Sequence, residues 1–221
     1  MSHTLRIENI EQVTHDVRSF RLKRPDGYTF TPGQATEVAI AKNDWREEKR
    51  PFTFTSLPTD EYLEFTIKSY PDHNGVTEQI GKLQVGDHLI VEEAWGAIEY
   101  KGPGVFIAGG AGITPFISIF RDLAKKGETD GNRLIFSNKT AEDVILQAEF
   151  EQILGADFIS VLTQKEHGDH HFGMINKDFL QNEIKDFSQH FYVCGPDKMV
   201  KDISAQLESL GADTDAVIFE K

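Results

Sequence analysis

The sequence predicts two domains: an antiparallel β-barrel at the amino end and an α/β domain with a parallel sheet at the carboxyl end. Up to about Tyr100, short runs of alternating hydrophobicity are separated by turn residues, as in closely spaced antiparallel strands. From Gly104 onward, apolar runs alternate with helical patterns, which is typical of βαβ units. A chain of 221 residues can bury two small cores. We therefore expect domains at 1–101 and 102–221, joined near Lys101-Gly102-Pro103-Gly104.

The strands of the expected barrel are bounded by residues that favour turns. Pro25-Asp26-Gly27, Pro32-Gly33 and Gly86-Asp87 supply these turns. The pattern predicts strands over 4–14, 17–25, 36–41, 50–56, 61–70 and 87–94.

The second domain is expected to contain four pairs of a strand and a helix. The pairs are 104–109 with 115–127, 133–138 with 141–154, 158–163 with 176–186, and 191–195 with 197–211. Strands joined by helical crossovers run parallel, so their carboxyl ends meet at one edge of the sheet.

Composition excludes several classes of function. The formal net charge is −13, which argues against a nucleic-acid-binding protein because phosphate neutralisation needs clustered Lys and Arg. The single cysteine, Cys194, cannot form an intramolecular disulfide. No stretch approaches the roughly 18 apolar residues that a membrane span needs, and MSHTLRIENI lacks the apolar stretch of a signal peptide. We expect a cytoplasmic protein that does not insert into membranes.

The stretch RPFTFTSLP at 50–58 combines an arginine with a row of hydroxyls. An arginine fork suits a phosphate, and a threonine hydroxyl can donate to a ring nitrogen or carbonyl. The alternative is an edge strand with a solvated arginine and threonines of good β-propensity. If 50–56 is one strand, one face carries Arg50, Phe52, Phe54 and Ser56, and the other carries Pro51, Thr53 and Thr55.

A second candidate phosphate site is NGVTEQIGKL at 74–83. Gly75 allows a turn, and Thr77 is positioned to cap a short helix whose amino end offers unpaired N–H groups to an anion. An ordinary capped helix, with Glu78 satisfying its positive end, explains the same residues.

The third candidate is VFIAGGAGITPF at 105–116, where a strand, a Gly109-Gly110-x-Gly112 turn and Pro115 follow one another. The pattern differs from the dinucleotide fingerprint because proline replaces its last glycine. Glycine turns are frequently structural, but this one lies between a strand and a helix at the first crossover, where nucleotides bind.

Together these segments resemble the ferredoxin-NADP reductase family. Arg50-Pro51-Phe52-Thr53 resembles its flavin motif, Gly75-Val76-Thr77 its second phosphate motif, 110–115 its nicotinamide loop, and Tyr192-Val193-Cys194-Gly195-Pro196 its late YxCGP segment. The four occur in the family's order, and the change from barrel to sheet covers nearly the whole chain.

The resemblance implies that the barrel binds flavin, as FAD rather than FMN. Arg50 would bind a flavin phosphate, Phe52 would replace the family's tyrosine beside the flavin, and Thr53 would hydrogen-bond near flavin N5. Tyr70 is a candidate for stacking on an adenine. The remaining flavin-binding residues that it implies are Pro51, Lys68, Ser69, Gly75, Val76 and Thr77.

The same resemblance implies that the second domain binds NAD(P)H. Cys194 would lie beside the nicotinamide, although a small buried side chain at a strand end explains it equally. Glu220 is the candidate for the family's near-terminal acid. The implied dinucleotide-binding residues are Gly110, Gly112, Ile113, Thr114, Ser137, Lys139, Gly195 and Pro196.

The implied reaction is hydride transfer from nicotinamide to FAD, followed by electron transfer to an acceptor on a separate chain, such as ferredoxin or flavodoxin. One cysteine excludes a four-cysteine iron–sulfur module on this chain, so the acceptor is separate. Two alternatives stay open: reduction of free flavin as a small molecule, and a non-catalytic flavin-binding regulatory subunit. An acidic carrier requires a basic patch, for which the candidates are Lys23, Arg24, Lys42, Arg46, Lys49 and Arg50.

Some residues depart from the family pattern. The given sequence ends Phe219-Glu220-Lys221, so we expect that the last-residue aromatic with which many family members cover the flavin is absent. Ser137, Asn138 and Lys139 contain no carboxylate for a ribose 2′-hydroxyl, which favours NADPH, while Met174 offers no second positive charge. We expect no metal site, because the loop residues Asp72, His73, His170 and His171 lack a further ligand at suitable spacing. The sequence leaves five questions open: the acceptor, the choice between NADH and NADPH, the final choice between FAD and FMN, whether an aromatic covers the flavin, and the oligomeric state.

Overall fold

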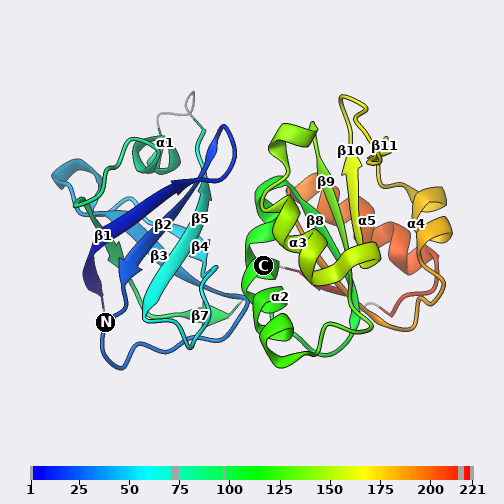
Figure 1. Cartoon of the computed structure of the whole chain (residues 1–221), viewed down its shortest axis with the longest axis horizontal. Coiled ribbons are helices and arrows are strands. Elements are labelled where there is room, and N and C mark those ends of the chain that lie inside the picture. Colours follow the sequence, from blue (N-terminus) through cyan, green and yellow to red (C-terminus); the bar gives the residue numbers. More distant parts are fainter. Residues whose placement is uncertain (1, 71–74, 97, 214–216, 220–221) are drawn as a thin grey trace. The chain divides into compact units, whose positions relative to one another are not determined.

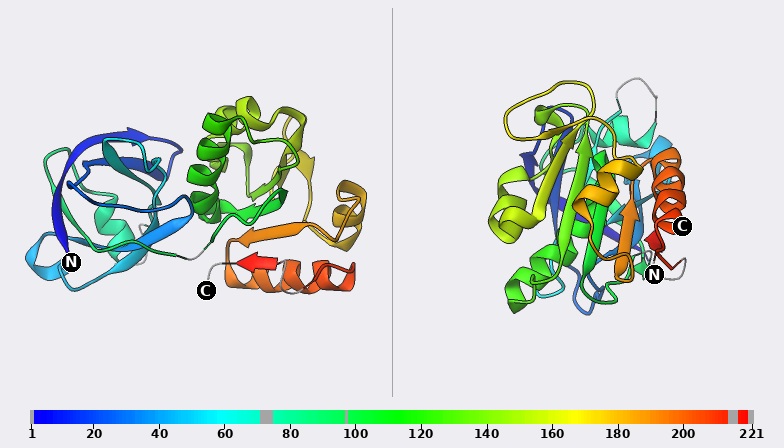
Figure 2. Two further views of the ribbon diagram at one scale, coloured as in Figure 1. Left: turned by 90° about the horizontal axis from the view of Figure 1, so that it is seen from below. Right: turned by 90° about the vertical axis from the view of Figure 1, so that its right-hand side faces the viewer.

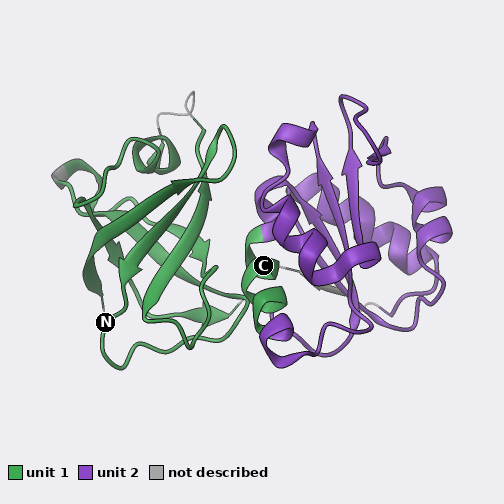
Figure 3. Cartoon of the chain, in the orientation of Figure 1, with its two compact units in different colours: residues 1–97, 114–122 green, residues 98–113, 123–221 purple. Residues whose placement is uncertain are grey.

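The computed structural model describes residues 2–70, 75–96, 98–213 and 217–219 (Figure 1). The chain divides into two compact units (Figure 3). The first unit comprises residues 1–97 and 114–122, and the second comprises 98–113 and 123–221. No helix within the described residues is both long enough and apolar enough to cross a membrane.

The first unit is an antiparallel, nearly closed barrel, as predicted. Its sheet order is β4-β3-β6-β1-β2-β5, with β7 paired to β3. The strands β4 and β5 end this order, and Thr55 N–H donates to Glu64 O at 2.8 Å to join them. The elements are β1 (His3–Gln12), β2 (Val17–Lys23), β3 (Gln34–Ile40), η1 (Asn43–Trp45), β4 (Arg50–Thr53), β5 (Tyr62–Lys68), α1 (Val76–Ile80), β6 (His88–Val91) and β7 (Trp95–Gly96).

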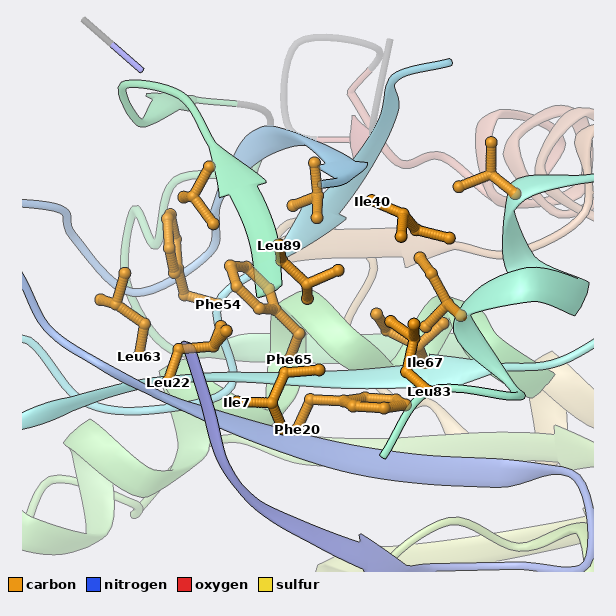
Figure 4. Close-up of a cluster of buried hydrophobic side chains, with 14 of the residues drawn as sticks. Ile7, Phe20, Leu22, Ile40, Phe54, Leu63, Phe65, Ile67, Leu83 and Leu89 are labelled. Atoms are coloured by element: carbon orange, nitrogen blue, oxygen red, sulfur yellow. The ribbon is translucent and has the colours of Figure 1, made fainter. Parts of the chain in front are cut away.

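Alternating side chains of these strands fill the barrel (Figure 4). On β5, for example, Leu63, Phe65 and Ile67 all belong to this core, as period-two strands require. Phe54 stacks on Phe30 with ring centroids 4.3 Å apart. This packing places Phe54 inside the barrel, immediately after the RPFT segment.

The predicted strand over 50–56 is too long. The strand β4 ends at Thr53, and the four residues 53–56 are all buried, so alternation between two faces does not continue. The backbone changes partners here. Phe54 N–H bonds to O of Gln34, the first residue of β3, whereas Thr55 N–H bonds to Glu64 O on β5.

The second unit contains a parallel sheet in the order β11-β10-β9-β8-β12-β13, as predicted. The observed β8 and β9 match the predicted 104–109 and 133–138. The strands are β8 (Gly104–Gly109), β9 (Arg133–Asn138), β10 (Phe158–Leu162), β11 (His171–Phe172), β12 (His190–Cys194) and β13 (Val217–Phe219). The helices are η2 (Gly110–Ile113), α2 (Thr114–Lys126), η3 (Ala141–Asp143), α3 (Gln147–Leu154), η4 (Gly155–Asp157), α4 (Lys177–Glu183) and α5 (Asp197–Ser209).

The sheet carries helices on both faces: α3 on one, and α4 and α5 on the other (Figure 2). The face toward α4 and α5 packs Ile107 and Val193 with Leu180, Ile203 and Leu207. Strand order turns at β8, because β9 lies on one side of it and β12 on the other. Ligands of open parallel sheets bind at the carboxyl ends of strands at such a point.

The prediction of a single helix over 141–154 is wrong, because two separate elements, η3 and α3, lie in this range. Its first part is the 3-10 turn η3, in which the Asp143 carboxylate accepts hydrogen bonds from Thr140 N–H at 2.9 Å and from Thr140 Oγ1 at 2.8 Å. Leu146 then adopts φ 54°, a left-handed conformation that a helix interior excludes, and α3 begins after it.

Candidate functional site

The RPFT segment runs from the surface of the barrel into its core. Arg50 and Pro51 are exposed, Phe52 packs against the core cluster, and Thr53 is buried. The guanidinium of Arg50 donates to its neighbour Lys49 O at 2.6 Å and lies 3.8 Å from the Glu48 carboxylate. The charge of Arg50 therefore stays at the barrel surface, where an anionic group can reach it.

Thr53 contacts the start of helix α2. Its Oγ1 lies 3.0 Å from Oγ1 of Thr114, the first residue of α2 and a member of the same compact unit. This hydrogen bond joins a residue of the first sequence motif to a residue of the third. A hydroxyl both donates and accepts, so Thr53 can bond Thr114 and still bond a second group.

The end of β5 and helix α1 form a second group of candidate residues in the barrel. Ser69 Oγ donates to Thr77 O at 3.2 Å, and Val76 is buried beside Thr77. Thr77 does not cap the helix, contrary to the prediction: the N-cap is Gly75, which has no side chain, and Thr77 is the second helical residue. Tyr70 is 40% exposed.

Lys68 is engaged by an acid. Its Nζ lies 2.8 Å from Asp16 Oδ2, and Thr14 Oγ1 donates to the other oxygen of Asp16 at 3.1 Å. Burial acts to raise the pKa of Asp16, but the hydrogen bond and charge of Lys68 outweigh it, and the pKa lies below its usual range. The Lys68 ammonium is thus held on Asp16.

In the second unit, the glycine turn lies directly on the end of β12. A Cβ on Gly112 would lie 2.4 Å from Cys194 O and 2.6 Å from Gly195 Cα. Gly110 has φ +52°, and the space around its missing Cβ is open. The structure therefore brings the GGAGIT turn and the Cys194-Gly195 segment together at the carboxyl edge of the sheet.

Cys194 ends β12, in register with Ala108 of β8. The residue is 4% exposed, as a small core side chain would be, and it also adjoins the glycine turn. Gly195 is partly buried, and Pro196 is the exposed N-cap of α5.

The other predicted dinucleotide residues lie at the end of β9. Ser137 pairs in register with Gly109 and is partly buried, while Lys139 is exposed. Between them Asn138 is 5% exposed, and neither atom of its side-chain amide bonds to a described residue. Ile113 is fully buried.

Sequence reasoning missed a buried carboxylate at the seam of the barrel. Glu64 is 2% exposed and accepts hydrogen bonds from Arg21 Nε at 2.7 Å, Arg121 Nη1 at 2.7 Å and Thr55 Oγ1 at 3.0 Å. Burial acts to raise the pKa of Glu64, but the charge of Arg121 and these hydrogen bonds lower it below its usual range. No local pattern distinguishes Glu64, because its partners lie 9, 43 and 57 residues away.

Glu220, the candidate for the near-terminal acid, lies outside the described residues, as do Asp72 and His73, for which no metal site was expected. His171 begins the short edge strand β11, and His170 directly precedes it.

Comparisons with known proteins identify both halves of the chain. The family model of the oxidoreductase FAD-binding domain matches residues 4–100, and that of the oxidoreductase NAD-binding domain matches 106–205. The reductase component of propane 2-monooxygenase from Rhodococcus jostii is 30% identical over 98% of this chain and 62% of the relative. NADH-cytochrome b5 reductase 1 of Arabidopsis thaliana is 29% identical over 90% of this chain and 77% of the relative. The chain thus spans about three fifths of the first of these relatives.

Solved structures share the fold. A ferredoxin NADP+ reductase from Neisseria gonorrhoeae, solved with bound FAD and NADP, has a TM-score of 0.84 at 22% identity and covers 99% of this chain and 98% of its own. The FAD/NAD-binding domain of a nitric oxide dioxygenase from Vibrio cholerae has a TM-score of 0.87 at 21% identity over 98% of this chain and 97% of its own. The chain therefore belongs to the oxidoreductases in which an FAD-binding domain precedes an NAD-binding domain, and it has the fold of the ferredoxin NADP+ reductase structure.

Proposed function

We propose that this chain is a flavoprotein reductase that takes hydride from NAD(P)H onto FAD and passes electrons to an acceptor on a separate chain. The observation that carries the proposal is the Thr53–Thr114 hydrogen bond of 3.0 Å, which joins the flavin motif to the end of the nicotinamide loop. We also propose that the domains meet near Lys101, between the two matched ranges.

The barrel residues fit a flavin. Arg50 offers an exposed cation to a phosphate, and Phe52 and Pro51 lie beside it on the same strand. Gly75, Val76 and Thr77 begin a helix whose N-cap has no side chain, so backbone N–H groups of this turn suit an anion. Because Lys68 is paired with Asp16, we assign its contribution to the backbone, with Ser69 next to it and Tyr70 available for an adenine.

The second unit fits a dinucleotide. Open space over Gly110 lets a pyrophosphate approach the backbone, and the absence of a Cβ at Gly112 lets the turn lie on Cys194 and Gly195. Ile113 anchors the turn in the core, and Pro196 starts α5 beside it. Ser137 and Lys139 offer a hydroxyl and a cation at the adjacent strand end, which favours NADPH over NADH.

The cofactors would supply the reactive chemistry, which is hydride transfer from reduced nicotinamide to the flavin and release of electrons to the acceptor. The part of the protein would be to orient the two cofactors and to exclude water. Thr53, oriented by Thr114, presents a hydroxyl for the flavin ring, and buried Cys194 bounds the nicotinamide side of the second unit.

The names of the relatives support a separate acceptor. Four of them are reductase components of oxygenase systems, including a ferredoxin–NAD(P)+ reductase component from Ralstonia. A ferredoxin is therefore the acceptor that we propose, and a flavodoxin is the second choice.

Three residues of the candidate basic patch are engaged within the chain, Lys42 and Lys49 by carboxylates and Arg24 by backbone carbonyls, which leave its charge in place. Lys42 lies 3.2 Å from Asp87, Lys49 pairs with Glu92, and Arg24 donates to Tyr28 O and to Asp60 O. An acidic carrier would compete with these intramolecular partners, so we expect weak, salt-sensitive docking of the acceptor.

Anaerobic titration with NADPH tests the proposal directly. The purified protein should retain FAD, whose visible absorbance should bleach on reduction and return when a ferredoxin is added. A protein that binds flavin only transiently would support the free-flavin reductase, and retained flavin that NADPH and NADH both fail to bleach would support the regulatory subunit.

A further inference from the structure

One face of helix α2 carries a row of polar side chains. Thr114, Ser118 and Arg121 are spaced four and three residues apart, which places them on the same side of a helix. The neighbouring residues Phe116, Ile117, Ile119 and Phe120 are fully buried apolar side chains. We call these three residues the polar seam of α2.

Each member of the polar seam bonds to the barrel within the first unit. Thr114 bonds Thr53 at 3.0 Å, and Ser118 Oγ accepts the N–H of Gly33 at 3.0 Å. Arg121 Nη1 donates to Thr55 O at 2.8 Å and to Glu64 Oε1 at 2.7 Å. The first two turns of α2 are therefore fastened to the barrel at three points.

Arg121 makes the ionic contact of the seam, and its partner Glu64 is held in place by other bonds. Glu64 is enclosed by the barrel and also held by Arg21 and Thr55. A buried carboxylate is tolerated only with its charge paired and its oxygens hydrogen-bonded, so removing Arg121 disturbs the whole group. Because Glu64 sits where β5 meets the residues after β4, Arg121 also fixes the closure of the barrel.

We infer that Arg121 is a positioning residue for hydride transfer, acting through Glu64 and Thr55 on the Thr53–Thr114 hydroxyl pair. Thr55 lies two residues beyond Thr53 on the same run of backbone, and Thr114 lies seven residues before Arg121 on the same helix. The guanidinium of Arg121 thus holds both the backbone that carries Thr53 and the helix that carries Thr114. The inference rests on the proposed role of Thr53 at the flavin.

Arg133 provides a matched control. It too bonds a carboxylate and a carbonyl, donating to Asp157 Oδ1 at 3.1 Å and to Glu183 O at 2.7 Å. It lies at the beginning of β9, at the end of the sheet opposite Ser137 and Lys139. Arg133→Met therefore removes a comparable set of bonds away from the proposed site.

The experiment compares Arg121→Met, Arg121→Lys and Arg133→Met. Hydrogen–deuterium exchange of the flavin-free proteins should be faster in Arg121→Met for peptides covering 114–122 and Gly33, and unchanged there in Arg133→Met. FAD affinity, measured by fluorescence titration, should stay within about threefold of wild type, because the phosphate contacts are intact. In stopped flow at saturating NADPH, flavin reduction should slow about tenfold or more in Arg121→Met, because a displaced hydroxyl misaligns the ring.

Arg121→Lys should recover part of the rate of flavin reduction, since this variant keeps the positive charge but cannot bond Thr55 and Glu64 together. A wild-type reduction rate in Arg121→Met, or equal slowing in Arg133→Met, would overturn the inference. If Arg121→Met does not fold, Glu64→Gln, which keeps the shape of the side chain, takes its place as the test. The same three measurements then apply: hydrogen–deuterium exchange, FAD affinity and the rate of flavin reduction. Wild-type protein that retains no FAD, or is not bleached by nicotinamide, would contradict the proposed function instead.

Discussion

Two alanine substitutions in the glycine turn should differ sharply in effect. At Gly112 a Cβ would meet Cys194 O at 2.4 Å, Cys194 C at 2.5 Å and Gly195 Cα at 2.6 Å, all of them backbone atoms. Cys194 is the last residue of β12 and Gly195 follows it directly; because β12 is bonded to both β8 and β13, this backbone cannot retreat without breaking sheet hydrogen bonds. We expect Gly112→Ala to cost about 3 kcal/mol, the upper end for overpacking.

Gly110→Ala is the comparison. Among the described residues, no atom beyond the two chain neighbours of Gly110 lies within 4 Å of the added Cβ, so the cost comes from holding alanine at φ +52°, about 1–2 kcal/mol. Alanine restricts the unfolded chain equally in both variants, so that contribution cancels in the comparison. Gly112→Ala should thus be less stable than Gly110→Ala by about 1–2 kcal/mol.

Urea denaturation followed by two signals provides the assay. Trp45 and Trp95 both belong to the first unit, so tryptophan fluorescence follows the barrel, whereas helix circular dichroism follows mainly the second unit. Gly112→Ala should lower the circular dichroism midpoint most and weaken NADPH binding about tenfold, equal to 1.4 kcal/mol. Equal destabilisation by the two variants, or wild-type NADPH affinity in Gly112→Ala, would refute this steric reasoning.

Three further predictions concern single side chains. Arg50→Ala should weaken FAD binding by roughly 1.5–3 kcal/mol through loss of a charge-assisted phosphate contact, and an unchanged dissociation constant in equilibrium titration would reject the assignment. Cys194→Ser should slow flavin reduction in stopped flow at saturating nicotinamide while FAD content stays intact, whereas a wild-type rate constant would make Cys194 purely structural. Glu64→Gln should cost about 2–3 kcal/mol at pH 7 by urea denaturation, toward the low end for a broken ion pair because both arginines are partly exposed. Since the pKa of Glu64 is lowered from 4.5 in the folded protein, the charged form stabilises above that pH and the wild-type advantage should shrink as pH falls below it; a constant difference would contradict the paired carboxylate.

Local patterns predicted the architecture well because strand and helix periods are properties of neighbouring residues. The bounds of β8 and β9 follow from unbroken apolar runs that end in glycine or polar residues, and α2 ends at Lys126, directly before Gly127 with φ +71°. The predicted bounds of an element were wrong where a residue distant in the sequence determines its end. The strand β4, which begins at Arg50, ends earlier than predicted because Thr55 pairs with β5, and this pairing exists only in the folded barrel.

The residues of the candidate site likewise fall into those that short motifs predicted and those that only the fold identifies. Arg50, Thr53 and the glycine turn stand in short motifs, so the sequence alone could identify them. Glu64 and Arg121 stand in none, and each looks like a surface charge in its own segment. Their bond depends on how β5 and α2 pack, which is a property of the fold and of no single stretch.

The polar seam of α2 has a consequence for building chimeric reductases. Residues 114–122 belong to the compact unit of the barrel although they follow the proposed join near Lys101 in the chain. A hybrid that fused residues 1–101 to the carboxyl half of a relative would enclose Glu64 opposite whatever residue the relative has at the position of Arg121. Compatible hybrids must therefore either inherit this acid–arginine pair together or replace both members with matching apolar side chains, and screens of such hybrids should select for the pairing before they select for cofactor preference.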